Sequence, residues 1–141
     1  KLKGIQYIIS SSEDVYRQNN YKMKILHPGT FITQKCYLDQ GLYDTRYKIG
    51  ADHDLLLRLI GNNKKFVFVN QVISNMSTGG ISSTRFIEGF KEQRKINIKH
   101  GQGILKSWAQ YIRSILVTGT VKLLTTNRTL AKMYERYKQF K

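Results

Sequence analysis

The chain has 141 residues, of which 40% are hydrophobic, enough for one ordinary domain with a core of modest size. Its 24 Lys and Arg residues against 9 Asp and Glu residues give a net charge of +15, which attracts phosphates, anionic lipids or nucleic acids without distinguishing among them. The single cysteine, Cys36, excludes an internal disulfide, and no apolar run reaches the roughly 20 residues that a membrane-spanning helix needs.

Three segments of the first half predict β-strands. Residues 4–10 alternate apolar side chains on one face, and Thr30–Thr33 is a short β-type run that follows a His-Pro-Gly turn. Residues 65–74 are β-branched and aromatic with few charges, which is typical of a strand covered on both faces. Together with the helices between them, these strands predict an α/β fold.

Two short helices are predicted between the strands. Residues 35–40 make one helical turn that ends at Gly41. Residues 52–60 make the clearest helix of the chain, which begins with an Asp and ends at Gly61. Its apolar face is predicted to consist of Leu56, Leu59 and Ile60.

The remaining residues, 84–141, predict a basic helical tail. They hold 13 basic and 3 acidic side chains, against 11 and 6 in residues 1–83. Helices are predicted at 85–100, 104–118 and 129–140, with breaks at Gly101, Gly103, Gly119 and Asn127. The middle helix is amphipathic, with Lys106 and Arg113 off an apolar stripe that consists of Ile104, Leu105, Trp108, Tyr111, Ile112, Ile115 and Leu116.

Several landmarks follow one another in the stretch from His27 to Ser82. It reads HPGTFITQKCYLDQGLYDTRYKIGADHDLLLRL, then KFVFVNQVIS, then STGGIS. This order resembles the second half of the catalytic domain of family 2 glycosyltransferases with the GT-A fold. In that family a His-led β segment precedes a Gly-Leu/Phe-Tyr/Phe-Asp turn, an acidic helix, a strand and a Gly-Gly-x-Ser loop. The family usually carries Glu-Asp where this chain has Ala51-Asp52, so only the second acid is kept.

The resemblance implies an α/β, partial GT-A-type domain, in which residues 1–83 are the acceptor-side half and 84–141 a helical extension. It implies an inverting enzyme that moves a sugar from a nucleotide-sugar donor to a glycan or lipid-linked acceptor in cell-surface polysaccharide synthesis. The family's nucleotide-binding half and Asp-x-Asp metal motif would precede Lys1. We therefore expect a fragment that is inactive alone, and a divalent cation, Mg or Mn, whose ligands lie mostly outside this chain.

Asp52 is the candidate catalytic base. Inverting transfer requires one carboxylate beside the acceptor hydroxyl to take its proton, and the resemblance puts Asp52 in that role. On spacing alone, an Asp that precedes Leu-Leu-Leu is more commonly an N-terminal helix cap. The resemblance therefore decides between the two interpretations in favour of the base.

His27 and Asp54 are candidate substrate-binding residues. His27 matches the family's histidine and either contacts a sugar or is a turn residue without chemistry. Asp54 is a second choice, because an i,i+4 pair with Arg58 gives it a structural role. His53 and His100 have no partners at metal-ligand spacing, so no residue is assigned as a metal ligand.

Gly79, Gly80 and Ser82 make a candidate diphosphate-binding loop within residues 76–83. The glycines give the backbone freedom, and N–H donors near a helix start can bind a diphosphate. Without the Lys of a P-loop, the more common interpretation of this motif is a flexible connector and helix cap.

Two other functions remain open at this point. The segment from Arg128 to Lys141 combines basic and apolar residues, which predicts binding to an anionic membrane surface. The protein would then be a peripheral enzyme at the inner face of the membrane. Alternatively, the chain is a noncatalytic membrane or protein adaptor, in which the helix from Ile104 to Leu116 is a partner surface instead of core. The net charge and the nine tyrosines also suit a nucleic-acid-binding domain, but no such motif is present and we expect no nucleic-acid partner. The lone cysteine favours the cytoplasm.

Overall fold

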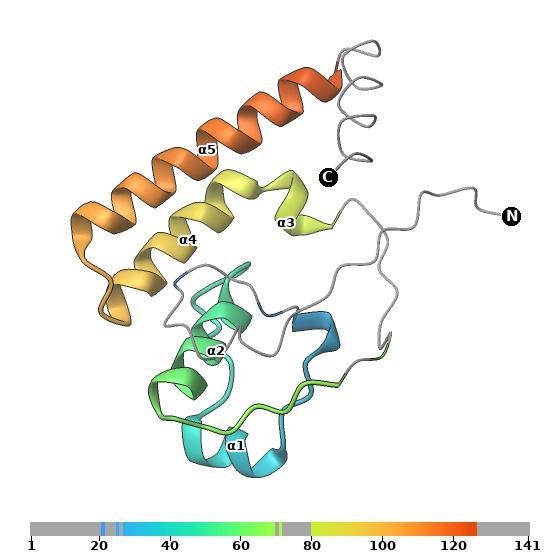
Figure 1. Ribbon diagram of the computed structural model, residues 1–141, viewed down its shortest axis with the longest axis vertical. Coiled ribbons are helices and arrows are strands. Elements are labelled where there is room, and N and C mark those ends of the chain that lie inside the picture. The colour runs from blue at the N-terminus through green and yellow to red at the C-terminus, as the bar shows by residue number, and fades with distance from the viewer. Residues whose placement is uncertain (1–20, 22–24, 26, 70, 72–79, 127–141) are drawn as a thin grey trace, which may run out of the picture. The chain divides into compact units, whose positions relative to one another are not determined.

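The computed structural model describes residues 21, 25, 27–69, 71 and 80–126. The chain divides into two compact units, Lys1–Thr84 and Arg85–Lys141. Every regular element in the described residues is helical (Figure 1). The predicted α/β fold of GT-A type is therefore wrong for this part of the chain.

Two of the three predicted strands are not strands where the structure describes them. Residues 65–69 are extended but form no sheet with any described segment, and Val67 and Val69 are exposed. Thr30–Thr33 is also irregular and leads into a helix. A β-type sequence becomes a strand only when a neighbouring backbone supplies its hydrogen bonds, and no described segment does so here. The third predicted strand, residues 4–10, lies outside the described residues, as do residues 70 and 72–74 of the predicted 65–74 strand.

The first unit contains a short 3-10 helix, η2 (His27–Gly29), and the helices α1 (Gln34–Gln40), α2 (Ala51–Gly61) and α3 (Ile81–Thr84). The hydroxyl of Thr33 caps α1 by accepting a hydrogen bond from the backbone N–H of Cys36 at 3.3 Å. Gly41 ends α1 with a φ of 80°, a left-handed conformation that favours glycine. The predictions of the His-Pro-Gly turn and of a helix ending at Gly41 are confirmed.

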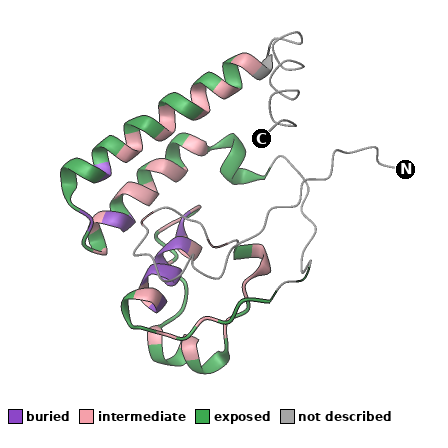
Figure 2. Ribbon diagram, in the orientation of Figure 1, coloured by how far each residue is buried: buried purple, intermediate pink, exposed green. Residues whose placement is uncertain are grey.

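Helix α2 supplies the core of the first unit. Leu55, Leu56 and Leu59 are buried and pack against a partly buried shell that consists of Ile25, Ile32, Cys36, Tyr37 and Phe66. Figure 2 shows this concentration of buried residues along α2. The sequence predicts that α2 buries a single apolar face. In the structure the helix is buried on several sides, and its buried residues include His53 and Asp54. The helix also includes Gly61, one residue past the predicted end.

The second unit is a helical hairpin of α4 (Phe86–Lys99) and α5 (Ile104–Thr126). The short connection between them turns at Gly101, which has a φ of 94°. Ile96 is the buried apolar residue of this pair, and Ser107 donates a hydrogen bond to the carbonyl oxygen of Arg94 at 3.2 Å. Helix α5 continues through Gly119, where the sequence predicted a break.

The predicted helix at 129–140 lies outside the described residues. Within the residues that are described, no helix is both long and apolar enough to cross a bilayer.

Candidate functional site

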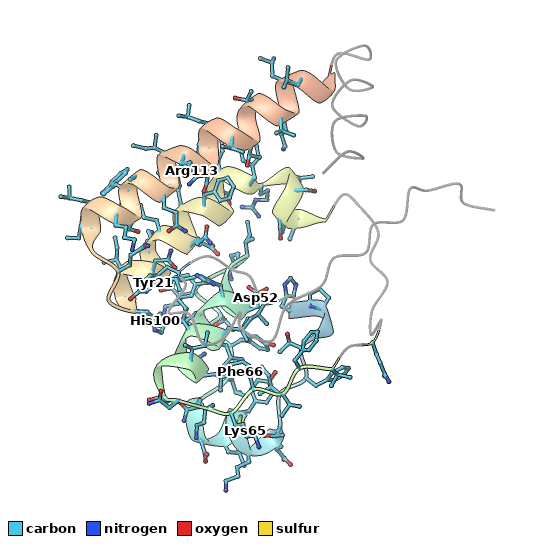
Figure 3. The ribbon with its side chains drawn as sticks, viewed as in Figure 1. Tyr21, Asp52, Lys65, Phe66, His100 and Arg113 are labelled. Carbon is cyan, nitrogen blue, oxygen red and sulfur yellow. The ribbon has the colours of Figure 1, made fainter. Side chains whose placement is uncertain are left out.

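The structure brings together two of the sequence-predicted site residues, His27 and Asp52. The imidazole Nδ1 of His27 lies 2.9 Å from the carboxylate Oδ2 of Asp52. The His27 side chain is 51% exposed and that of Asp52 is 19% exposed, so the pair is open to solvent on the imidazole side. Figure 3 labels Asp52 near the start of α2. A carboxylate fixed by an imidazole at a partly open surface is an arrangement that can accept a proton.

Local structure explains why these two side chains meet. The N–H of Thr30 donates to the carbonyl oxygen of His27 at 3.0 Å and closes the η2 turn, which fixes the histidine backbone. Asp52 lies in the first turn of α2, and its Oδ1 accepts a hydrogen bond from the N–H of His53 at 2.7 Å. The helix cap itself is Gly50, without a side-chain hydrogen bond, so Asp52 is not the N-cap residue.

Two tyrosines add to the polar surroundings of Asp52, and the sequence did not single them out. The hydroxyl groups of Tyr37 and Tyr43 lie 3.2 Å apart, at hydrogen-bond distance, and their ring centroids are 5.9 Å apart. The hydrogen bond with Tyr37, burial, and the negative charge of Asp52 together raise the pKa of Tyr43 from 10.0 to about 12. The sequence feature that could have identified Tyr43 is its position in the Gly-Leu-Tyr-Asp turn.

Asp54 is buried, unlike the partly exposed His27–Asp52 pair. Its side chain is 0% exposed, and its Oδ2 accepts a hydrogen bond from Nε of Arg58 at 3.1 Å. The guanidinium of Arg58 also donates to the carbonyl oxygens of Gln40, Gly41 and Leu42. The predicted i,i+4 pair is confirmed, and the contacts to the end of α1 extend it: Arg58 ties α2 to the loop after α1.

The glycine-rich candidate loop is described only in part. Gly79 lies outside the described residues, whereas Gly80 and Ser82 are exposed at the start of the four-residue helix α3. The carbonyl oxygen of Gly80 accepts hydrogen bonds from the N–H and hydroxyl of Ser83, at 3.0 and 2.7 Å. These contacts are local to the start of α3.

The remaining candidates have packing roles. His53 is buried within α2, and Cys36 is a free cysteine packed against the leucine core. The described residues contain no group of three or more His, Cys, Asp or Glu side chains that could hold a metal ion. This part of the chain therefore does not provide a ligand set for the divalent cation that the resemblance implies.

No protein family model matches this chain, and neither a curated protein nor a solved structure is similar to it.

Proposed function

We propose that this chain takes part in transferring a sugar from a nucleotide-sugar donor to a hydroxyl group of a glycan or lipid-linked acceptor, with Asp52 as the catalytic base. The observation that carries the proposal is the 2.9 Å contact between His27 and Asp52. The helical fold of the described residues lends it no support. Further support comes from the chemistry of the site and from the motif order of residues 27–82.

The proposed step needs one proton acceptor near the sugar acceptor. As the acceptor oxygen bonds to the anomeric carbon, its proton passes to Asp52, and the bond from that carbon to the nucleoside diphosphate breaks with its electron pair on the departing oxygen. Oδ1 of Asp52 accepts one hydrogen bond, from the N–H of His53, and Oδ2 lies 2.9 Å from Nδ1 of His27, so each carboxylate oxygen retains a further lone pair.

His27 is a positioning residue in this proposal. Through Nδ1 it holds the carboxylate in one orientation, because this ion pair and the hydrogen bond from the N–H of His53 together leave little rotational freedom. Asp54 is assigned no catalytic role, because its side chain is buried and its carboxylate pairs with Arg58. A divalent cation, if the enzyme uses one, would help bind and neutralise the diphosphate. The proposed location is the cytoplasm, consistent with a free Cys36.

Replacing Asp52 by Asn tests the proposal in the natural protein that carries this sequence. Sugar transfer from a panel of nucleotide sugars should fall by roughly 100-fold or more, because the amide cannot take the proton, while folding is retained. The matched control is Asp39→Asn, an acid on α1 whose carboxylate pairs with Lys64 at 3.3 Å. It should transfer sugar at the normal rate.

A second pair of variants tests the positioning role. His27→Asn keeps a side-chain N–H donor and should retain more activity than His27→Leu, with kcat affected more than KM. Activity in Asp52→Asn equal to that of the unmodified protein would remove Asp52 from the base role. Losses from His27→Leu as large as those from Asp52→Asn would instead make His27 the proton acceptor.

A further inference from the structure

Helix α5 carries an apolar face that its partner helix does not cover. Leu105, Ile112, Leu116 and Leu123 are spaced at intervals of seven, four and seven residues, which places them within about 40° of one another around the helix. Their exposed fractions are 87%, 52%, 63% and 75%. These four residues are called the apolar face of α5. Figure 2 shows α5 as exposed or half-buried along most of its length.

The contacts with α4 begin at one border of this face, where Arg94 covers Trp108, and extend to the opposite side of α5. Ser107 is fully buried and bonds to the carbonyl oxygen of Arg94 on α4. It follows Leu105 by two residues, which turns it about 200° away from the apolar face. The sequence predicts one apolar stripe along this helix. In the hairpin, only one edge of that stripe contacts α4. An exposed apolar face of this kind marks an interaction site.

The charges on α5 identify what would cover that face. The helix contains three basic residues and no acidic one. Lys106 and Arg113 each follow a residue of the apolar face by one position, so they border it about 100° round the helix, and both are exposed. Long basic side chains beside an apolar strip can reach phosphate groups while the strip enters a less polar layer.

Trp108 lies at the opposite border of the apolar face. It follows Leu105 by three residues, which places it about 60° round the helix on the side away from Lys106. Arg94 covers its ring with the guanidinium carbon 3.9 Å from the ring centroid, and 44% of the residue remains exposed. An amphipathic indole at such a border suits the boundary between headgroups and acyl chains.

We propose that the apolar face of α5 lies on the surface of a bilayer that contains anionic phospholipid. A second copy of the chain would be a poorer occupant, because pairing two such faces would bring the bordering cations together with no acid on α5 to offset them. The segment 128–141, which the sequence predicts to bind membranes, is a separate contributor outside the described residues.

The experiment uses Trp108, the single tryptophan of the chain, as the reporter. Adding phosphatidylcholine vesicles with one third phosphatidylserine to the full chain should shift its fluorescence to shorter wavelength, and brominated acyl chains should quench it. Pure phosphatidylcholine should give a much smaller change, and raising the salt concentration should weaken binding. An unchanged tryptophan spectrum with anionic vesicles would overturn the proposal.

Neighbouring residues of α5 provide matched variants. Leu116→Gln removes one member of the apolar face, whereas Val117→Gln alters a residue of similar exposure, 55%, that points about 100° away. Leu116→Gln should weaken vesicle binding by roughly tenfold, since it loses the burial of one leucine side chain. Val117→Gln should bind nearly as the unmodified chain does. Equal effects of the two substitutions would count against the apolar face as the contact.

Two further measurements distinguish membrane binding by α5 from binding by the last residues of the chain and from self-association. A chain that ends at Arg128 should keep the fluorescence shift, whereas its loss would assign membrane binding to the last residues alone. Sedimentation equilibrium should show no self-association that Leu116→Gln abolishes. If it does, a second copy covers the face and the membrane proposal is wrong.

Discussion

Helix α2 of the first unit and helix α5 of the second unit differ in how much of their apolar surface is buried. In the first unit, α2 buries four leucines together with a charged residue, Asp54. In the second unit, the α4–α5 hairpin buries Asn97, Gln102 and Ser107 and leaves most of the large apolar side chains of α5 exposed. Residue type alone therefore does not predict burial in this chain.

The difference follows from what each helix has to pack against. The leucines of α2 find apolar neighbours in α1, in the segments that precede it and in the segment that follows α2, namely Ile25, Ile32, Cys36, Tyr37 and Phe66. Helix α5 is 23 residues long and has one described partner, α4, which is 14 residues long. One helix can cover only one side of another, so the rest of the apolar surface of α5 stays open.

The largest expected effect concerns the buried ion pair of the first unit. Arg58→Met should destabilise that unit by about 3–5 kcal/mol, because it leaves the Asp54 carboxylate buried without its cation. The carbonyl groups of residues 40–42 lose a donor as well. Urea denaturation followed by circular dichroism measures the loss, and hydrogen exchange should rise in α1 and α2 but not in the hairpin.

The matched control is the Arg46–Asp44 pair of the same unit. Its guanidinium and carboxylate meet at 2.7 Å, with the arginine side chain 80% exposed and that of Asp44 16% exposed. Arg46→Met should lower the urea midpoint much less, because solvent screens the exposed guanidinium and the backbone N–H of Arg46 still donates to the Asp44 carboxylate. Equal losses from Arg58→Met and Arg46→Met would contradict the contrast between buried and exposed charges.

A smaller loss of stability is expected when a leucine is replaced by alanine in each of the two units. Leu55 is 1% exposed in α2, whereas Leu105 is 87% exposed in α5. Leu55→Ala should reduce the free energy of unfolding by about 2–5 kcal/mol through lost burial and a cavity. Leu105→Ala should change it by less than about 0.5 kcal/mol. A large destabilisation by Leu105→Ala would mean that the apolar face of α5 is covered within the chain.

Features that depend on nearby residues could be predicted from the sequence. The helix ending at Gly41, the helix at 52–60 and the Asp54–Arg58 pair involve residues no more than a few positions apart. The strand prediction failed over residues 65–69, the described part of 65–74 apart from residue 71, because a strand depends on a partner that local sequence does not reveal. The break predicted at Gly119 failed because a mid-helix glycine costs only about 1 kcal/mol, which the rest of a long helix offsets.

The candidate site shows the same limit. Asp52 and His27 were each proposed from the motif order, but their contact joins two segments that are distant in sequence and depends on how η2 approaches α2. Tyr43 was missed because its interaction with Tyr37 arises only when the loop after α1 folds back. Arg58 holds that loop by its contacts to Gln40 and Leu42, which no spacing rule predicts.

The smallest expected effect is a dependence of the stability of the first unit on pH, which the hairpin should not show. The folded state raises the pKa of Tyr43 from 10.0 to about 12, first through the hydrogen bond with Tyr37. A raised pKa means that the folded state holds the proton more tightly than the unfolded state. The stabilisation is therefore complete below about pH 10 and is lost as the pH rises from 10 towards 12. Because Tyr43 is partly exposed, the change should be small.

Urea midpoints measured between pH 9 and about pH 12 check this expectation. Tyr43→Phe should flatten the pH dependence, and Tyr37→Phe should move the tyrosinate absorbance transition of Tyr43 back towards its ordinary pKa, because the largest cause of the shift is removed. Both variants keep the aromatic ring, so the ring contact at 5.9 Å is retained and a loss of packing does not explain the result. If the alkaline loss of stability persists unchanged in Tyr43→Phe, another group is responsible, and the Tyr37–Tyr43 hydrogen bond does not couple proton binding to the folding of the first unit.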